Sequence, residues 1–309
     1  MIDGDEAREA IAQAARRTTA RRDLERHDRF SEISPEVGVL DDGAFGDLMD
    51  DDLDEALTLL VDMATATDAE LRAQARALAA RIIVDLAKSG GAARRGIGRL
   101  SSRRASVAEG DVDLDASLES ISAARAAGEP VSLDELTVRS WVRPDTAVCL
   151  LVDRSGSMRG ERLAAAALAA AAVVYRHPHH SAVVAFSGTA VVAKAIDEER
   201  HGDDLADDVL QLRGHGVTDL GLAARTAQAQ LERSKAARRI TLLLSDARST
   251  SGGDPTEDAA ALRSLGELVI LAPASDTEDA AALAAATGAR LIALEGPGDV
   301  PRAIAEALG

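Results

Sequence analysis

Within the first ninety positions, apolar residues keep helical spacing in two stretches, at residues 53–64 and at residues 71–86. Between these stretches, Thr67 and Glu70 form a capping box, which is typical of a helix start, and the pair Gly90-Gly91 follows the second stretch as a stop signal. The pattern predicts a helical hairpin within a mostly helical region at residues 1–90.

In the C-terminal half, short continuous apolar runs alternate with helical stretches. The runs are too short for helices and show no polar alternation, which is typical of strands buried on both faces of a parallel sheet. They lie at residues 148–152, 182–186, 240–244, 268–271 and 290–293. We therefore expect an α/β domain at residues 136–309, built on a doubly wound, mainly parallel, Rossmann-like sheet with helices on both faces. Residues 136–142 alternate in polarity and are expected to enter this domain as an edge strand.

Residues 91–135 have a different composition and predict a basic and acidic linker with a short helix. Arginines lie among glycine, serine and alanine at positions 94, 95, 99, 103 and 104. The acidic stretch Asp111–Asp115 follows, and we interpret it as the cap of a helix at residues 116–127. A calcium-binding EF-hand is disfavoured, because it would need glycine at position 116 and glutamate at position 122, where Ala116 and Ser122 stand.

Two of the buried-strand patterns end in carboxylates, and these carry the candidate chemistry. The first continues into an Asp-x-Ser-x-Ser turn with Asp153, Ser155 and Ser157, and the run at residues 240–244 is followed by Asp246. Thr218 adds a hydroxyl on a glycine-rich loop before a helical stretch. Parallel strands place their carboxyl ends at one edge of the sheet, where ligands bind. Carboxylate and hydroxyl oxygens suit Mg²⁺, or alternatively Mn²⁺ or Ca²⁺, better than zinc.

From about Thr146 onward, the chain resembles a von Willebrand factor A (VWA) domain. These five residues match, in type and order, the metal-ion-dependent adhesion site of that family. The resemblance implies that the hydroxyls of Ser155, Ser157 and Thr218 touch the metal, whereas Asp153 and Asp246 hold coordinating waters. It also implies that an acidic side chain of a partner protein completes the coordination, so the site serves binding and not catalysis.

The order of segments resembles a wider group of bacterial proteins. A helical region, an arginine-rich link, an acidic stretch and a metal-site domain are similar to single-chain proteins that work with MoxR-type AAA+ ATPases, and to VWA subunits of magnesium and cobalt chelatases. The chain has no Gly-x-x-x-x-Gly-Lys-Ser/Thr motif, so the resemblance implies an ATPase on a separate polypeptide. A chelatase subunit stays open as an alternative function, because it would share the site and differ only in partner and cargo.

Two other interpretations of the candidate site are weaker. A phosphatase with Asp153 as nucleophile would resemble haloacid dehalogenases, but these need a second acid at the position of Ser155. The five side chains could also merely cap helices and end strands. Their occurrence in the expected order favours the metal site.

The composition limits the classes of partner that we expect and indicates the cellular compartment. The formal charge of −17 opposes binding to nucleic acid or to an anionic membrane. Cys149 is the only cysteine and lies in a strand pattern, which fits a reducing compartment. The N-terminus is acidic, without a secretory signal, and no apolar run is long enough to span a bilayer, so we expect a cytoplasmic protein without membrane insertion.

Overall fold

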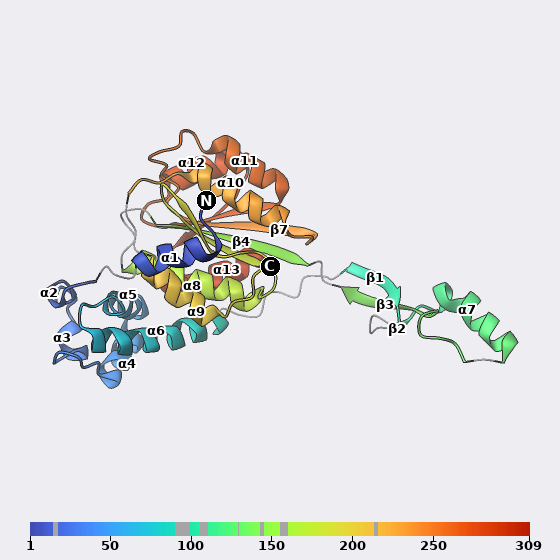
Figure 1. Cartoon of the computed structure of the whole chain (residues 1–309), viewed down its shortest axis with the longest axis horizontal. Coiled ribbons are helices and arrows are strands. Elements are labelled where there is room, and N and C mark those ends of the chain that lie inside the picture. Colours follow the sequence, from blue (N-terminus) through green and yellow to red (C-terminus); the bar gives the residue numbers. More distant parts are fainter. Residues whose placement is uncertain are drawn as a thin grey trace. The chain divides into compact units, whose positions relative to one another are not determined.

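The computed structural model describes the chain at residues 1–14, 18–89, 99–105, 111–128, 130–142, 145–154, 160–212 and 216–309. The chain divides into two units (Figure 1). The larger consists of Met1–Ala92 with Thr146–Leu308, and the smaller of Ala93–Asp145. Each unit is considered by itself below.

The larger unit is built on a six-stranded sheet with the order β6-β5-β4-β7-β8-β9. All neighbouring strands are parallel except β6, which pairs antiparallel with β5. The strands are β4 (Thr146–Asp153), β5 (Ser181–Phe186), β6 (Ala190–Lys194), β7 (Arg238–Leu244), β8 (Glu267–Pro273) and β9 (Arg290–Leu294). The predicted mainly parallel α/β sheet is therefore confirmed. The strand order reverses between β4 and β7, which is where doubly wound sheets bind ligands.

Helices cover both faces of this sheet, and the side chains of β4 alternate between two cores. Cys149 and Leu151 face one core, whereas Val148, Leu150 and Val152 face the other. The first core is covered by α10 (Leu220–Glu232), α11 (Thr256–Leu265) and α12 (Glu278–Thr287). The second is covered by α8 (Glu161–Arg176), α9 (Gly202–Gln211) and α13 (Val300–Leu308), which follows the short 3₁₀ helix η1 (Pro297–Asp299).

The N-terminal helices extend this second core outward. They are α1 (Gly4–Ala14), α2 (Arg21–Leu24), α3 (Phe30–Ile33), α4 (Asp42–Asp51), α5 (Leu53–Met63) and α6 (Ala69–Ser89). Helices α5 and α6 form the predicted hairpin, and both pack on α8. Every residue of α8 from Leu163 to Val174 is buried, because the helix lies between the sheet and this outer layer. The helical region and the sheet thus share one hydrophobic core.

The smaller unit holds a second, antiparallel sheet with the order β1-β3-β2 and one helix. Its elements are β1 (Arg99–Arg104), β2 (Asp111–Val112), α7 (Leu114–Ala127) and β3 (Thr137–Val142). The predicted strand at residues 136–142 is present as β3, but the expectation that it joins the large sheet is wrong. It pairs along its whole length with β1, from Thr137 opposite Arg104 to Val142 opposite Arg99. The predicted acidic cap of the helix is confirmed, since Asp113 accepts a hydrogen bond from the backbone N–H of Ala116.

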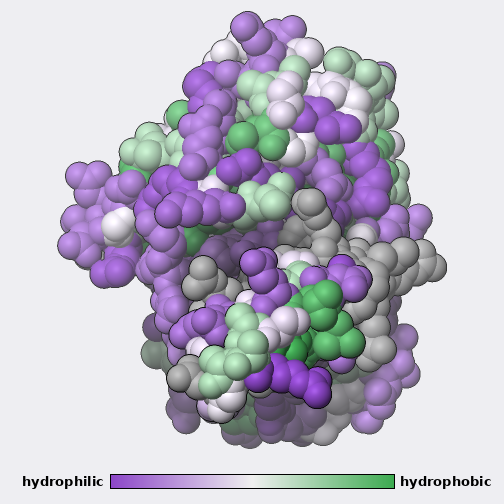
Figure 2. Space-filling view, turned by 90° about the vertical axis from the view of Figure 1, so that its right-hand side faces the viewer, coloured by the Kyte–Doolittle hydropathy of each residue, from purple (hydrophilic) through white to green (hydrophobic). Residues whose placement is uncertain are grey.

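The basic stretch before β1 lies partly outside the described residues, including Arg94 and Arg95. The surface drawn in Figure 2 is mainly hydrophilic, with hydrophobic side chains in small separate groups. Among the helices of the described ranges, none is long and apolar enough to cross a membrane.

Candidate metal centre

Asp153 ends β4 at the carboxyl edge of the large sheet, and only 5% of its surface is exposed. Val152 pairs with Leu244 of β7, so Asp153 lies beside Ser245, the first residue after that strand. The Ser245 hydroxyl donates a hydrogen bond of 2.7 Å to Asp153 Oδ2. Sequence analysis missed Ser245. The available signal was its position directly before Asp246, at the end of a strand expected near Asp153.

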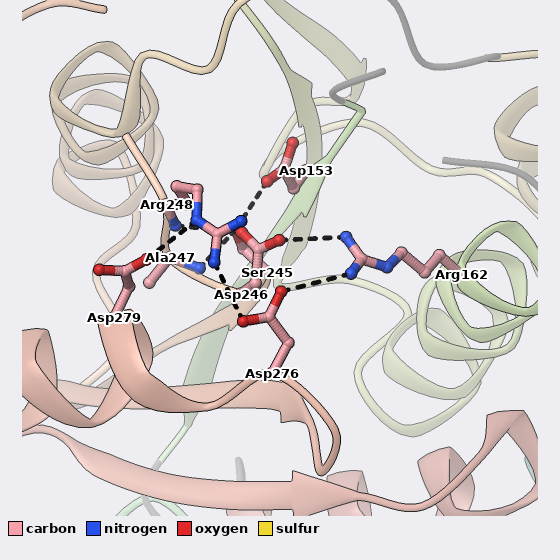
Figure 3. A network of polar contacts seen from close by, with 8 residues as sticks. All are labelled: Asp153, Arg162, Ser245, Asp246, Ala247, Arg248, Asp276 and Asp279. Carbon is pink, nitrogen blue, oxygen red and sulfur yellow. Dashed lines mark hydrogen bonds and ion pairs between the residues drawn. The ribbon is translucent and has the colours of Figure 1, made fainter. Parts of the chain in front are cut away.

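Asp246 lies on the same edge, and its carboxylate is held from two sides (Figure 3). Its Oδ1 accepts a hydrogen bond of 3.0 Å from the backbone N–H of Arg248. Its Oδ2 accepts one of 3.1 Å from Nη1 of Arg162, in the first turn of α8. Asp246 is 9% exposed, so a guanidinium compensates a nearly buried carboxylate. Sequence analysis missed Arg162 as well, because nothing in its local sequence indicates which acid it faces.

Two arginines extend this arrangement into an ion-pair network. Arg162 also reaches Asp276, at 3.8 Å. Arg248 pairs with Asp276 at 3.2 Å and with Asp279 at 3.1 Å. The loop that carries Asp246 is thus tied to the start of α8 and to the segment that leads into α12.

Thr218 is bound to the same loop through its backbone. Its N–H donates to Thr250 Oγ1 at 2.8 Å, and its carbonyl accepts from the N–H groups of Thr250 and Ser251, both at 3.0 Å. The next residue, Asp219, caps α10 by accepting from the N–H of Leu222. The structure therefore joins the Thr218 loop to the loop after Asp246, and Thr218 is 3% exposed.

Ser155 and Ser157 lie outside the described residues. The described part of the site brings together Asp153 and Asp246 and ties in the loop of Thr218. Its donors are carboxylate and hydroxyl oxygens, which fit a hard divalent cation such as Mg²⁺. Within the described ranges, no group of three or more histidine, cysteine, aspartate or glutamate side chains could hold a metal ion.

The outer helical layer reaches this edge through α5. Asp54 Oδ1 accepts a hydrogen bond of 2.7 Å from the N–H of Gly298, in η1. At Gly160, directly before α8, an added Cβ would lie 2.8 Å from Thr58 Cγ2. Helix α5 thus contacts the residue that follows the Asp153 loop and the turn that precedes α13.

Comparison with known families agrees with this geometry. Residues 147–290 match the family model of the von Willebrand factor type A domain. This chain contains a VWA domain. Such domains are typically non-catalytic interaction modules, so the fold is typical of a binding function.

Solved structures show similarity at low sequence identity. An aerotolerance-related membrane protein from Bacteroides fragilis is 16% identical, with 53% of this chain and 98% of that chain covered and a TM-score of 0.42. Proximal thread matrix protein 1 from the mussel byssus, with a zinc-occupied MIDAS motif, is 15% identical, with 53% and 46% covered and a TM-score of 0.42. Manganese-loaded TRAP protein from Plasmodium vivax is 18% identical, with 48% and 64% covered and a TM-score of 0.40. This chain therefore spans about half of the mussel protein. No curated protein matches the sequence.

Proposed function

We propose that the VWA domain binds a divalent cation, preferably Mg²⁺, and through it an acidic side chain of a partner protein. The observation that carries this proposal is the pair of nearly buried carboxylates, Asp153 and Asp246, at the ends of the neighbouring strands β4 and β7. Two carboxylates repel each other at such an edge unless positive charge lies between or beside them. Arg162 supplies one such charge, and a bound cation supplies the rest.

In this proposal each side chain has a separate task. Ser155, Ser157 and Thr218 would contact the metal with hydroxyl oxygens, while Asp153 and Asp246 hold its waters. Ser245 fixes the Asp153 carboxylate, and the N–H of Arg248 fixes that of Asp246. When bound, the metal would supply a Lewis acid for a carboxylate of the partner.

We further propose that the partner complex includes a MoxR-type AAA+ ATPase on a separate chain, with this protein as its adaptor. The order of segments along the chain supports this function, and so does the contact of α5 with both Gly160 and Gly298. A force applied to the bound partner would pass from the metal edge into the helical layer. Co-purification of the full chain with an ATPase encoded beside it, with and without a chelator, tests the adaptor function. Loss of the complex in chelator is the expected result.

The metal proposal is tested by thermal unfolding of the full chain with and without Mg²⁺. At ten times the Kd, binding adds about 1.4 kcal/mol and should raise the Tm by roughly 2–5 °C. Asp153→Ala should abolish this increase and leave the helical content unchanged. Asp47→Ala, at an exposed position in α4, is the matched control and should keep the increase. A wild-type Tm that does not respond to Mg²⁺ would overturn the proposal.

A further inference from the structure

A small cavity adjoins the candidate metal centre on the side of α8. It has a volume of about 90 Å³ and opens at the carboxyl edge of β4, β7, β8 and β9. Its polar lining consists of Asp153, Glu161, Arg162, Ser245, Asp246 and Ser275. Leu244, Leu294 and Ala165 are among its apolar walls, and each of them is at most 9% exposed. The cavity thus combines apolar walls with a charged side, on which the acid pair lies.

The volume limits what can fill this cavity. An apolar cavity that holds benzene measures about 150 Å³, so this cavity is smaller than one that holds an aromatic ring. A branched aliphatic side chain fits, whereas an aromatic ring does not. Walls of leucine, alanine and proline give water few hydrogen bonds, and they gain from contact with carbon atoms.

The position of the cavity indicates where such a side chain would come from. Asp153 and Asp246 belong both to the cavity wall and to the candidate metal centre, so a carboxylate bound at the metal has this space beside it. We propose that the cavity receives an aliphatic side chain next to the acidic group that the partner offers to the metal. This inference rests on the proposed metal-dependent function. It implies that the protein recognises its partner by an acidic group and by an adjacent side chain of about the size of leucine.

The probes are N-acetyl-leucine, N-acetyl-alanine and N-acetyl-phenylalanine, which share one carboxylate and differ only in the side chain. Each is titrated into the Mg²⁺-loaded full chain, and binding is followed by NMR chemical shifts. Filling the cavity with three further carbons should make N-acetyl-leucine bind roughly fiftyfold more tightly than N-acetyl-alanine. N-acetyl-phenylalanine should show no such gain. Equal affinity of the leucine and alanine probes would overturn the inference.

Two substitutions test whether this preference arises in the cavity. Ala165→Leu fills the space from α8, and Ser275→Trp covers its mouth from an exposed position, so the second variant does not disturb the core. Both should reduce the leucine preference to about one while keeping the Mg²⁺-dependent increase in Tm. Ala282→Leu, on the exposed side of α12, is the matched control and should keep the preference. Retention of the preference in both cavity variants would contradict the inference.

The same data separate the two proposals. A wild-type chain without an Mg²⁺-dependent Tm increase would contradict the metal-dependent function. A chain that shows the increase and no leucine preference would contradict the cavity inference alone.

Discussion

At the scale of single residues, the site depends on how two acids are compensated. The sequence was sufficient to place Asp153 and Asp246 at one sheet edge, because each follows a buried-strand pattern and parallel strands end together. It was not sufficient to identify Ser245 and Arg162 as their partners. Those contacts depend on the register of β4 against β7 and on where α8 begins, and both are set by tertiary packing.

Arg162 is expected to weaken cation binding, because its guanidinium lies 3.1 Å from Asp246 Oδ2 and repels a metal at the same edge. Arg162→Gln keeps a hydrogen-bond donor and removes the charge. We predict a Kd for Mg²⁺ that is lower by at least about tenfold in calorimetric titration, because a unit charge several ångström from a divalent cation costs several kcal/mol at an effective dielectric constant of about 20. In chelator, the Tm of this variant should fall, since the acid pair loses its compensating charge. Arg302→Gln, in an exposed ion pair, is the control. An Mg²⁺ affinity that is unchanged or weaker in Arg162→Gln would be inconsistent with this role.

Lys194 in β6 is a buried cation away from the site, and it should make stability depend on pH. Its side chain is fully buried, and its Nζ donates to the carbonyl of Ser181 at 2.6 Å and to that of Ala195 at 3.3 Å. Burial lowers the pKa of Lys194 to about 8. Between this value and the ordinary pKa of 10.5, the unfolded chain binds more protons than the folded chain, so stability rises with pH. Below pH 8 the cost of burying the charge is present in full.

Lys194→Met removes this dependence. The free energy of unfolding of the variant relative to wild type should fall by about 2 kcal/mol between pH 7 and pH 9.5. Urea denaturation at the two pH values measures it. A difference between variant and wild type that does not change with pH would contradict a depressed pKa for Lys194.

At the scale of elements, the patterns predicted where helices and strands lie better than they predicted which elements pack or pair with each other. The strand at residues 136–142 formed as expected, but its alternation could not indicate that β1 would be its partner. Helix α8 carried a signal that was not used. Its residues from Leu163 to Val174 have no polar face, and a helix that is apolar all round must be buried on all sides. That pattern already required a second layer over α8, which α5 and α6 provide.

The contact of α5 with the loop before α8 can be tested at Gly160. This residue has a φ of +49°, and an added Cβ would meet Thr58 Cγ2. With φ +49° and ψ −115°, Gly160 lies in a backbone region that favours glycine, so Gly160→Ala should destabilise the chain by roughly 1–3 kcal/mol from the backbone conformation alone, with a further cost from the contact. Thr58→Ser removes Cγ2 and should therefore remove the cost of the contact, whereas the cost of the backbone conformation should remain.

Gly288 provides a control for the contact. It lies in the left-handed region, at φ +70° and ψ +23°, and nothing lies within 4 Å of an added Cβ. Gly288→Ala should therefore show the backbone cost without any rescue by Thr58→Ser. Urea denaturation of the single and double variants measures the coupling. Additive effects of Gly160→Ala and Thr58→Ser would show that Thr58 of α5 does not contact residue 160.

At the scale of the whole molecule, the helical region and the VWA sheet belong to one compact unit. The sequence suggested two regions separated by a linker, because the helical pattern stops near residue 90 and the strand patterns begin near residue 146. Because these segments are far apart in the sequence, the sequence patterns could not indicate that α5 and α6 pack against α8. Through that cover, the proposed metal edge is in contact with the helical layer, and the proposed adaptor function needs such a connection.

The most direct test of the central claim is anomalous scattering from crystals of the full chain soaked in Mn²⁺ as a substitute for Mg²⁺. The account predicts one strong peak at the carboxyl edge between β4 and β7, with hydroxyls of Ser155, Ser157 and Thr218 in direct contact and the carboxylates of Asp153 and Asp246 close by. A peak elsewhere, or no peak in crystals that diffract well, would contradict it.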